Sequence, residues 1–209
     1  MKPTGISWLP FIPEHWKLIR AKYLFIKQNR APLPEDDVVT CFRDGQVTLR
    51  KNRRTTGFTE SFKEIGYQGI RKGDLVIHQM DAFAGSTGVS DSDGKATPVY
   101  IVLTPIDETV DNHYFALVVR HMGLCGYIQS LYRGIRERSS NFSYDVFCRQ
   151  YLPVPPIEEQ KRIVEKLNSR TNSVNSLINE LQTQIELLND YKQRLIADAV
   201  TGQINVQKI

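Results

Sequence analysis

A sustained heptad pattern between Pro155 and Gly202 constrains this chain more than any other feature. Apolar residues recur there in alternating steps of three and four, with β-branched residues favoured at one position and leucine at the other, which is typical of a coiled-coil helix. The positions that form this seam are Val164, Leu167, Thr171, Val174, Ile178, Leu181, Ile185, Leu188, Lys192, Leu195 and Ala199. A helix of roughly 44 residues, at a rise of about 1.5 Å per residue, would be about 66 Å long.

Residues at both ends of this pattern favour helix boundaries. Pro155 and Pro156 stand at its start, where proline is compatible with the first helical turn. Glu158 and Glu159 follow where the helix dipole favours carboxylates, and Gly202 comes just after the last seam residue, where glycine often ends a helix. An amphipathic helix of this length must bury its apolar seam against another helix. The sequence predicts no second helix of similar length, so the pattern implies a helical partner.

Length and composition place the chain among ordinary globular proteins. Its 209 residues suffice for one sizeable domain with an extension, or for two small domains. No apolar run reaches the ~18–20 residues that a membrane-spanning helix requires, and residues 1–16 contain three prolines instead of the apolar stretch of a signal peptide. Cys41, Cys125 and Cys148 form no closely spaced pair, which argues against a zinc site or a disulfide framework. We therefore expect a protein of the reducing cytoplasm that contacts no membrane.

The basic excess lies entirely in the front part of the chain. Residues 1–156 contain 20 Lys and Arg against 16 Asp and Glu, whereas residues 157–209 contain seven of each kind. A net charge of +4 does not by itself indicate a nucleic-acid partner, so the clustering of the basic residues matters more than their sum.

The front part alternates short β-like runs with turns and short helices, the pattern of an α+β protein. Candidate strands are Val38–Phe42, Leu75–Gln79 and Val99–Leu103. Candidate helices are Glu14–Lys27 and Asn112–His121, and Gly126–Tyr132 is expected to be a short helix or a turn. Residues Asp145–Pro153 are expected to be extended and to lead toward the C-terminal helix. The prolines at its start, Pro155 and Pro156, prevent the helix from beginning earlier. The sequence thus predicts a globular mixed α/β domain over residues 1–154, followed by one long coiled-coil helix over residues 155–209.

Two basic clusters are candidate DNA-binding sites. Arginine can bond to guanine edges and to phosphates in a bidentate manner, and neighbouring hydroxyl and amide side chains can donate to phosphate oxygens. The candidate residues are Arg50, Lys51, Asn52, Arg53 and Arg54 in the first cluster and Arg133, Arg136, Arg138, Ser139 and Asn141 in the second. Composition alone favours the alternative that these are solvated surface loops whose arginines pair with Glu60 or Glu137, because basic surface loops are common.

Catalytic and metal-binding motifs are weak throughout. The segment Gly85–Gly88 is too short for a phosphate-binding loop, and no dinucleotide-binding glycine pattern follows a strand. The four histidines never occur at the spacing of metal ligands, and Ser86 has no base beside it in the sequence. These features favour a binding domain without a catalytic site or a metal.

Four groups of residues, in this order along the chain, resemble the specificity (S) subunit of type I restriction-modification systems. The N-terminal group is Gly5–Trp8 with Ile12–Trp16, and the landmarks inside the domain are Gly73–Leu75, Gly85–Val89 and Thr97–Tyr100. The most specific group, Pro155–Val164, resembles the start of the long helical region of this family, and Leu195–Gly202 resembles the usual end of such subunits.

The resemblance implies a non-catalytic DNA target-recognition domain that positions a modification (methyltransferase) subunit and a restriction subunit on double-stranded DNA. In the family, the modification subunit uses S-adenosylmethionine and the restriction subunit uses ATP, so neither cofactor is expected to bind this chain. The base-reading residues differ between members of the family, so the two basic clusters rest on charge and placement alone.

Full S subunits carry two recognition domains, each followed by a long helix, whereas this sequence predicts one of each. The resemblance therefore implies half a subunit, with the helix of a second copy covering the seam. Antiparallel pairing would place two recognition domains at opposite ends of the helix pair, within reach of half-sites about one to two turns of DNA apart, a turn being roughly 34–36 Å. Two identical halves related by a dyad would read an interrupted palindrome.

Two other classes of protein remain as alternatives. The front domain could be a fragment associated with a nuclease or methyltransferase and without sequence specificity of its own, although no methyltransferase catalytic motif or S-adenosylmethionine glycine loop is present. The chain could also be a coiled-coil interaction protein whose basic patches are only solvated. Sequence-selective, salt-sensitive DNA binding without cleavage would distinguish the recognition subunit from both.

Overall fold

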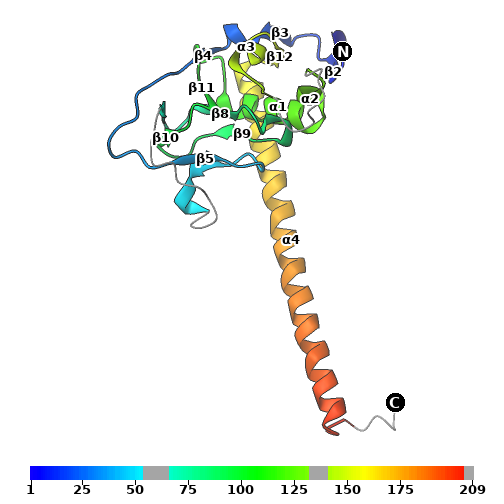
Figure 1. Cartoon of the computed structure of the whole chain (residues 1–209). Coiled ribbons are helices and arrows are strands. Elements are labelled where there is room, and N and C mark those ends of the chain that lie inside the picture. Colours follow the sequence, from blue (N-terminus) through cyan, green and yellow to red (C-terminus); the bar gives the residue numbers. More distant parts are fainter. Residues whose placement is uncertain (54–65, 132–140, 205–209) are drawn as a thin grey trace. The chain divides into compact units, whose positions relative to one another are not determined.

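The computed structural model of the chain describes residues 1–53, 66–131 and 141–204 (Figure 1). Its contacts divide the chain into two compact units, Met1–Ile163 and Val164–Ile209. The division falls inside the long helix α4 (Ile157–Val200), so the first turns of this helix belong to the first unit.

The first unit is built from short strands and a few helices. The strands are β1 (Lys2–Ile6), β2 (Leu9–Ile12), β3 (Lys17–Arg20), β4 (Phe25–Lys27), β5 (Val39–Cys41), β6 (Val47–Leu49), β7 (Gln68–Ile70), β8 (Leu75–His78), β9 (Thr87–Val89), β10 (Gly94–Ala96), β11 (Tyr100–Pro105) and β12 (Tyr151–Val154). The helices are α1 (Asn112–Leu124), α2 (Tyr127–Ser130) and α3 (Tyr144–Phe147), and the 3-10 turns are η1 (Ala21–Tyr23), η2 (Arg50–Asn52) and η3 (Ala82–Ala84). This mixture confirms the α+β class and the long C-terminal helix.

A four-stranded antiparallel sheet, in the order β4–β11–β8–β9, forms the centre of the first unit (Figure 1). The segments Leu75–Ile77 in β8 and Ile101–Leu103 in β11 are completely buried. Val76 and Val102 share a buried cluster with residues of β5, β6, β7 and β10. Because successive side chains of a strand point to opposite faces, the residues next to Val76 and Val102 in β8 and β11 are buried on the opposite face. Burial on both faces explains why these segments of the two strands are apolar at every position.

Helix α1 packs against β8, β9 and η3. The Asp111 side chain caps it by accepting a hydrogen bond from the His113 amide at 2.7 Å. Phe115, Val119 and Met122, spaced by four and three residues, are fully buried. The predicted helix at 112–121 is therefore confirmed as α1, and of the helix or turn expected after Gly126 the structure has the helix α2.

Two local predictions were wrong. Residues Glu14–Lys27 are not a helix, because β3 pairs with β12 (Arg20 opposite Tyr151, Lys17 opposite Val154) and β4 pairs with β11. Pairing with strands far along the sequence thus overrides the local apolar period. The segment Asp145–Pro153 is extended only in its second half, since α3 forms first and β12 follows.

Helix α4 has 44 residues and confirms the long helix that the heptad pattern predicted. Within the described residues of α4, the side chain that is buried is that of Gln160. The seam residues from Leu167 to Leu195 are 37% to 66% exposed at their apolar positions. The apolar seam positions of this helix from Leu167 to Leu195 are therefore exposed in the single chain.

Candidate nucleic-acid interface

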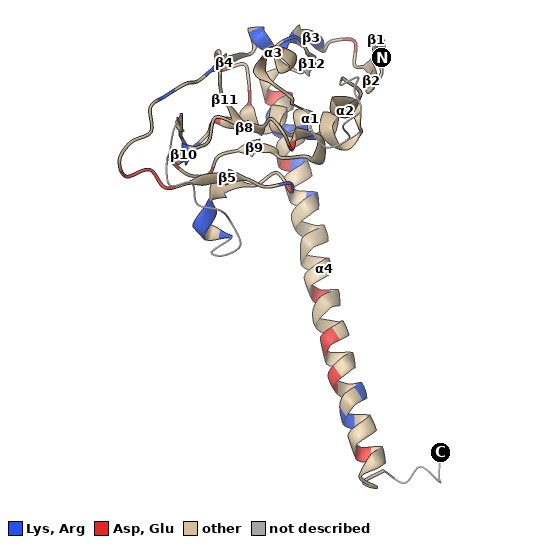
Figure 2. Cartoon of the chain, viewed as in Figure 1, with Lys and Arg blue, Asp and Glu red and all other residues tan. Residues whose placement is uncertain are grey.

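The first basic cluster lies on the turn η2, directly after the hairpin of β5 and β6. The hairpin pairs Val39 with Leu49 and Cys41 with Val47, and Gly45 provides the positive φ of 91° that its turn requires. Figure 2 shows basic residues gathered on the turn that follows this hairpin. The local fold thus places Arg50, Lys51 and Arg53 together on the surface of the first unit.

Several of these side chains have partners within the domain. Lys51 Nζ lies 2.6 Å from a carboxylate oxygen of Asp37, and an Arg53 guanidinium nitrogen lies 2.6 Å from a carboxylate oxygen of Asp44. The Arg53 guanidinium also covers the ring of Phe42, at 4.3 Å from its centroid. The alternative interpretation of paired surface arginines thus holds for Arg53, with a carboxylate other than the predicted ones.

Hydrogen bonds keep both carboxylates ionised. The hydrogen bond from Lys51 lowers the pKa of Asp37 below its ordinary value. Burial opposes the ionisation of Asp44, but the hydrogen bonds from the Gln46 amide and from Arg53 outweigh it, so the pKa of Asp44 is also lowered. Such exposed ion pairs are weak in water, so Lys51 and Arg53 can exchange these carboxylates for the phosphates of a nucleic acid.

Two other polar residues of the first cluster face the hairpin. Asn52 donates from its amide nitrogen to the Thr48 hydroxyl at 2.8 Å, and Arg50 Nε lies 3.5 Å from the Thr40 hydroxyl. Arg54 lies outside the described residues, as do Arg133, Arg136, Arg138 and Ser139 of the second cluster. Asn141 is exposed, and the next residue, Phe142, is fully buried and donates its amide hydrogen to the Gln79 carbonyl at 2.9 Å.

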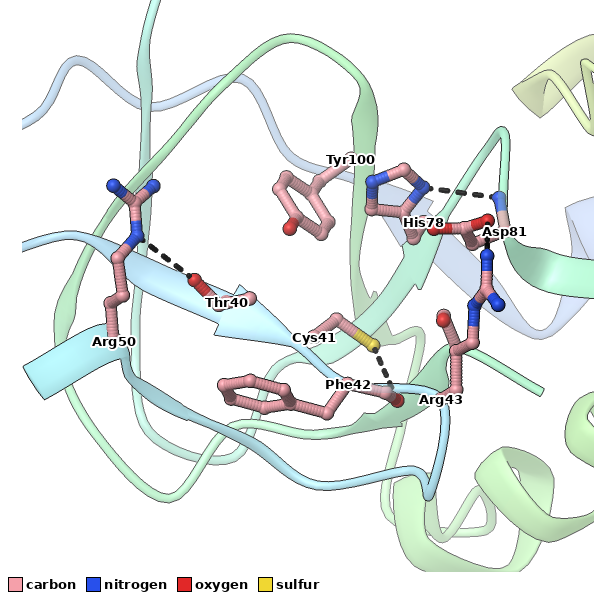
Figure 3. Close-up of a pocket in the computed structure, with 9 residues that line it drawn as sticks. Thr40, Cys41, Phe42, Arg43, Arg50, His78, Asp81 and Tyr100 are labelled. Atoms are coloured by element: carbon pink, nitrogen blue, oxygen red, sulfur yellow. Dashed lines mark hydrogen bonds and ion pairs between the residues drawn. The ribbon is translucent and has the colours of Figure 1, made fainter. Parts of the chain in front are cut away.

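Beside the β5–β6 hairpin the domain contains a pocket of about 410 Å³ (Figure 3). The residues that line it come from β5 and the turn after it, from η2, from the end of β8 and the β8–β9 connection, and from the start of β11. They are Thr40, Cys41, Phe42, Arg43, Arg50, His78, Asp81, Ser86 and Tyr100. Sequence reasoning selected Arg50 as a site residue but none of the others, and set Ser86 aside, because strands far apart in the sequence bring these residues together.

Arg120 of α1 holds two walls of this pocket in place. One of its guanidinium nitrogens donates to the Arg43 carbonyl at 2.6 Å and to the Gly85 carbonyl at 2.7 Å. The first of these carbonyls belongs to the β5–β6 turn and the second to the segment just before Ser86. One side chain thus fixes the separation of the two loops.

Hydrogen bonds and ring contacts orient the groups inside the pocket. The Asp81 carboxylate accepts from Arg43 at 3.0 Å, and the Asp81 amide donates to His78 Nδ1 at 3.1 Å (Figure 3). Because Nδ1 accepts this bond, Nε2 carries the proton of the neutral ring. The His78 and Tyr100 rings meet edge to face with their centroids 4.8 Å apart.

Burial determines the protonation of the pocket. It raises the pKa of the Cys41 thiol to about 12 and that of the Tyr100 hydroxyl to about 12, so both keep their protons at neutral pH. Burial also lowers the pKa of His78, against the opposing effect of Asp81. The pocket therefore presents neutral donors together with two arginines and one carboxylate, which suits binding better than nucleophilic attack by the thiol.

Neither a metal centre nor a membrane span is found in the part of the chain that the structure describes. Within residues 1–53, 66–131 and 141–204, no three His, Cys, Asp or Glu side chains are grouped so as to hold a metal ion. Among the same residues, no helix has both the length and the apolarity needed to cross a bilayer.

Comparison with known proteins gives one family match. The family model of the type I restriction modification DNA specificity domain matches residues 50–187, which include both basic clusters and most of α4. A search of the curated proteins found no match.

Solved structures of similar fold come from type I restriction-modification systems. A chain from a study of complex assembly and conformational transition of the type I R-M system matches with a TM-score of 0.62 and 17% identity, over 90% of this chain and 46% of that chain. The S subunit of the type I system from M. genitalium gives a TM-score of 0.53 and 15% identity, over 94% and 49%. The HsdS subunit from Thermoanaerobacter tengcongensis matches with a TM-score of 0.50 and 17% identity, over 80% of this chain and 40% of that chain. The chain thus spans about half the length of these solved chains, and the likeness shows a shared fold.

Proposed function

This chain belongs to the family of type I restriction-modification DNA specificity domains, and we propose that it reads a DNA sequence on behalf of modification and restriction subunits. The observation that carries the proposal is the family match over residues 50–187. The matching family is one of DNA recognition and not of catalysis. The basic turn η2 supports a role in DNA binding, because it presents cations to solvent on the surface of the domain.

The exposed seam of α4 supports pairing with a second copy of the chain. Leu181, Ile185 and Leu188 are 49%, 58% and 66% exposed, which is unusual for leucine and isoleucine at regular helical spacing. The solved chains that share the fold are about twice as long. Two copies, paired through antiparallel α4 helices, would supply two recognition domains.

A symmetric pair would read an interrupted palindrome, and α4 would set the length of its spacer. The modification subunit would supply S-adenosylmethionine chemistry and the restriction subunit would supply ATP-dependent chemistry, while this chain would bind neither cofactor. Such a complex would act on DNA in the cytoplasm.

The experiment that tests this proposal is selection of bound duplexes from a random pool, followed by binding measurements at several salt concentrations. The expected result is an enriched sequence that is bound without cleavage. Replacement of Arg50, Lys51 and Arg53 together by alanine should weaken binding to every duplex and reduce the slope of log K against log salt by about 0.9 for each lost phosphate contact.

Two basic residues of α4 offer a matched control. Replacement of Lys166 and Arg170 by alanine removes two exposed cations of the helix and should leave affinity and slope unchanged. An unchanged affinity of the triple variant would remove η2 from the interface. Binding without any sequence preference would favour the interaction protein whose basic patches are only solvated.

A further inference from the structure

We propose that the pocket beside the β5–β6 hairpin binds a single nucleobase that carries an exocyclic amino group and has left the base stack. This inference rests on the proposed function, since it assigns one element of the DNA recognition to named residues. The pocket opens between the β5–β6 turn and the β8–β9 connection, and Arg50 belongs both to its lining and to the basic turn η2.

The size and shape of the pocket suit one small flat ligand. Its volume of about 410 Å³ lies within the range of ~300–1,000 Å³ that is usual for small-molecule sites. A base that remains stacked in a duplex presents only its edge to a protein, so it cannot fill a concave site. A nucleobase inside this pocket must therefore be unstacked, as it is in proteins that read extrahelical bases.

Ser86 provides an unmet hydrogen bond. Ser86 is 1% exposed and lines the pocket, and its hydroxyl oxygen has no hydrogen-bond partner among the described residues. Buried polar atoms in folded proteins nearly always have a partner, so an unpartnered one beside a pocket points to a polar ligand. A base nitrogen or carbonyl oxygen that approaches Ser86 would satisfy it.

Asp81 distinguishes a nucleobase from a phosphate. Its carboxylate is about one-third exposed and is held at 3.0 Å by Arg43, so it stands ready to accept from an amino group. His78 accepts from the Asp81 amide at Nδ1, so its neutral ring carries the hydrogen on Nε2, from which it can donate to a ligand. The edges of adenine, cytosine and guanine combine an amino donor with acceptors, which matches this arrangement. A phosphate would have to approach the carboxylate, and thymine has no amino group to offer it.

The rings of the pocket are positioned for contact with a base. Tyr100 and His78 meet edge to face, and Tyr100 is 9% exposed, so the Tyr100 ring is held in place. Arg53 covers Phe42 at the border of the pocket. Aromatic and guanidinium planes of this kind are the usual platforms for unstacked bases.

The test is a titration of the full chain, labelled for NMR at histidine, with deoxyadenosine, deoxycytidine, deoxyguanosine, thymidine and inorganic phosphate in turn. We expect the three nucleosides with an amino group to shift the His78 signal, and thymidine and phosphate to shift it less. Asp81→Asn should weaken binding of the three about tenfold, the usual scale for loss of one base contact. Ser86→Ala should weaken it as well, so that the test does not depend on one variant.

Asp37→Asn is the matched control, because Asp37 also accepts from a basic side chain but lies outside the pocket. It should leave the titration unchanged. A shift caused by phosphate and not by nucleosides would overturn the inference, as would equal binding of all four nucleosides in wild type and Asp81→Asn.

Duplex binding separates this inference from the proposed function. If the chain selects a DNA sequence while nucleosides fail to bind, the pocket assignment fails and the recognition function stands. If nucleosides bind as expected but no duplex is selected, the recognition function fails and the pocket remains a nucleobase site.

Discussion

Gln160 shows how a single buried polar residue can join two elements of the fold. Its side chain is 0% exposed in the first turn of α4. The amide oxygen accepts from the Asp111 backbone at 3.0 Å, and the amide nitrogen donates to the carbonyls of Thr109 at 3.0 Å and Pro155 at 2.9 Å. The start of α4 is thereby fixed to the segment that leads into α1.

Replacement of Gln160 by leucine should lower the free energy of unfolding of the domain by about 2–4 kcal/mol. The buried Pro155 carbonyl loses its partner, which costs about 1–3 kcal/mol, and two part-buried hydrogen bonds are lost as well. Urea unfolding followed by circular dichroism measures this change. Gln182→Leu, on the exposed surface of α4, is the control and should change stability by less than about 0.5 kcal/mol. Equal effects of the two variants would show that the three hydrogen bonds contribute little.

Asp74 marks the limit of residue-level prediction. Asp74 stands directly before strand β8, and its carboxylate accepts from the Arg71 amide at 2.7 Å. The same carboxylate is 5% exposed and binds Arg30 through two bonds of 2.6 and 3.0 Å. Its hydrogen bond raises the pKa of Arg30. No local pattern connects these two residues, because their contact depends on the pairing of distant segments.

At the scale of the element, patterns that a segment satisfies by itself predicted the structure correctly. The heptads of α4, the helical segment that forms α1, and the strand segments that form β8 and β11 are examples. The segment Glu14–Lys27 has the apolar spacing of a helix, but its backbone pairs with β12 and β11. The pocket escaped prediction for the same reason, because His78, Asp81 and Tyr100 share a site only after the strands have paired.

The contact of α1 with η3 depends on a glycine. A Cβ atom added at Gly123 would collide with the Ala82 carbonyl oxygen, and the surrounding atoms are backbone and cannot turn aside. Gly123→Ala should therefore destabilise the domain by about 1–3 kcal/mol, the usual cost of overpacking, although alanine favours helices. Thermal or urea unfolding measures the change. A variant more stable than wild type would mean that α1 shifts away from η3 without loss.

At the scale of the whole molecule, the sequence predicted a recognition domain with a long helix, and the family match agrees. The exposed seam accounts for the need for a partner, because the residues that would bury it in a pair are open to solvent in the single chain. If the helix separates two recognition domains, its length becomes part of the DNA specificity. A change in length should then alter the spacing of the half-sites and not their sequence.

The measurement that tests this account most directly is duplex selection with the wild-type chain and with a variant that lacks residues 175–181, one heptad of α4. This deletion joins Val174 to a segment that continues the same seam, so pairing should persist. We predict that the wild type selects an interrupted inverted repeat and that the variant selects the same half-sites with a different spacer. Selection of a single site without a repeat, or of altered half-sites by the variant, would contradict the account.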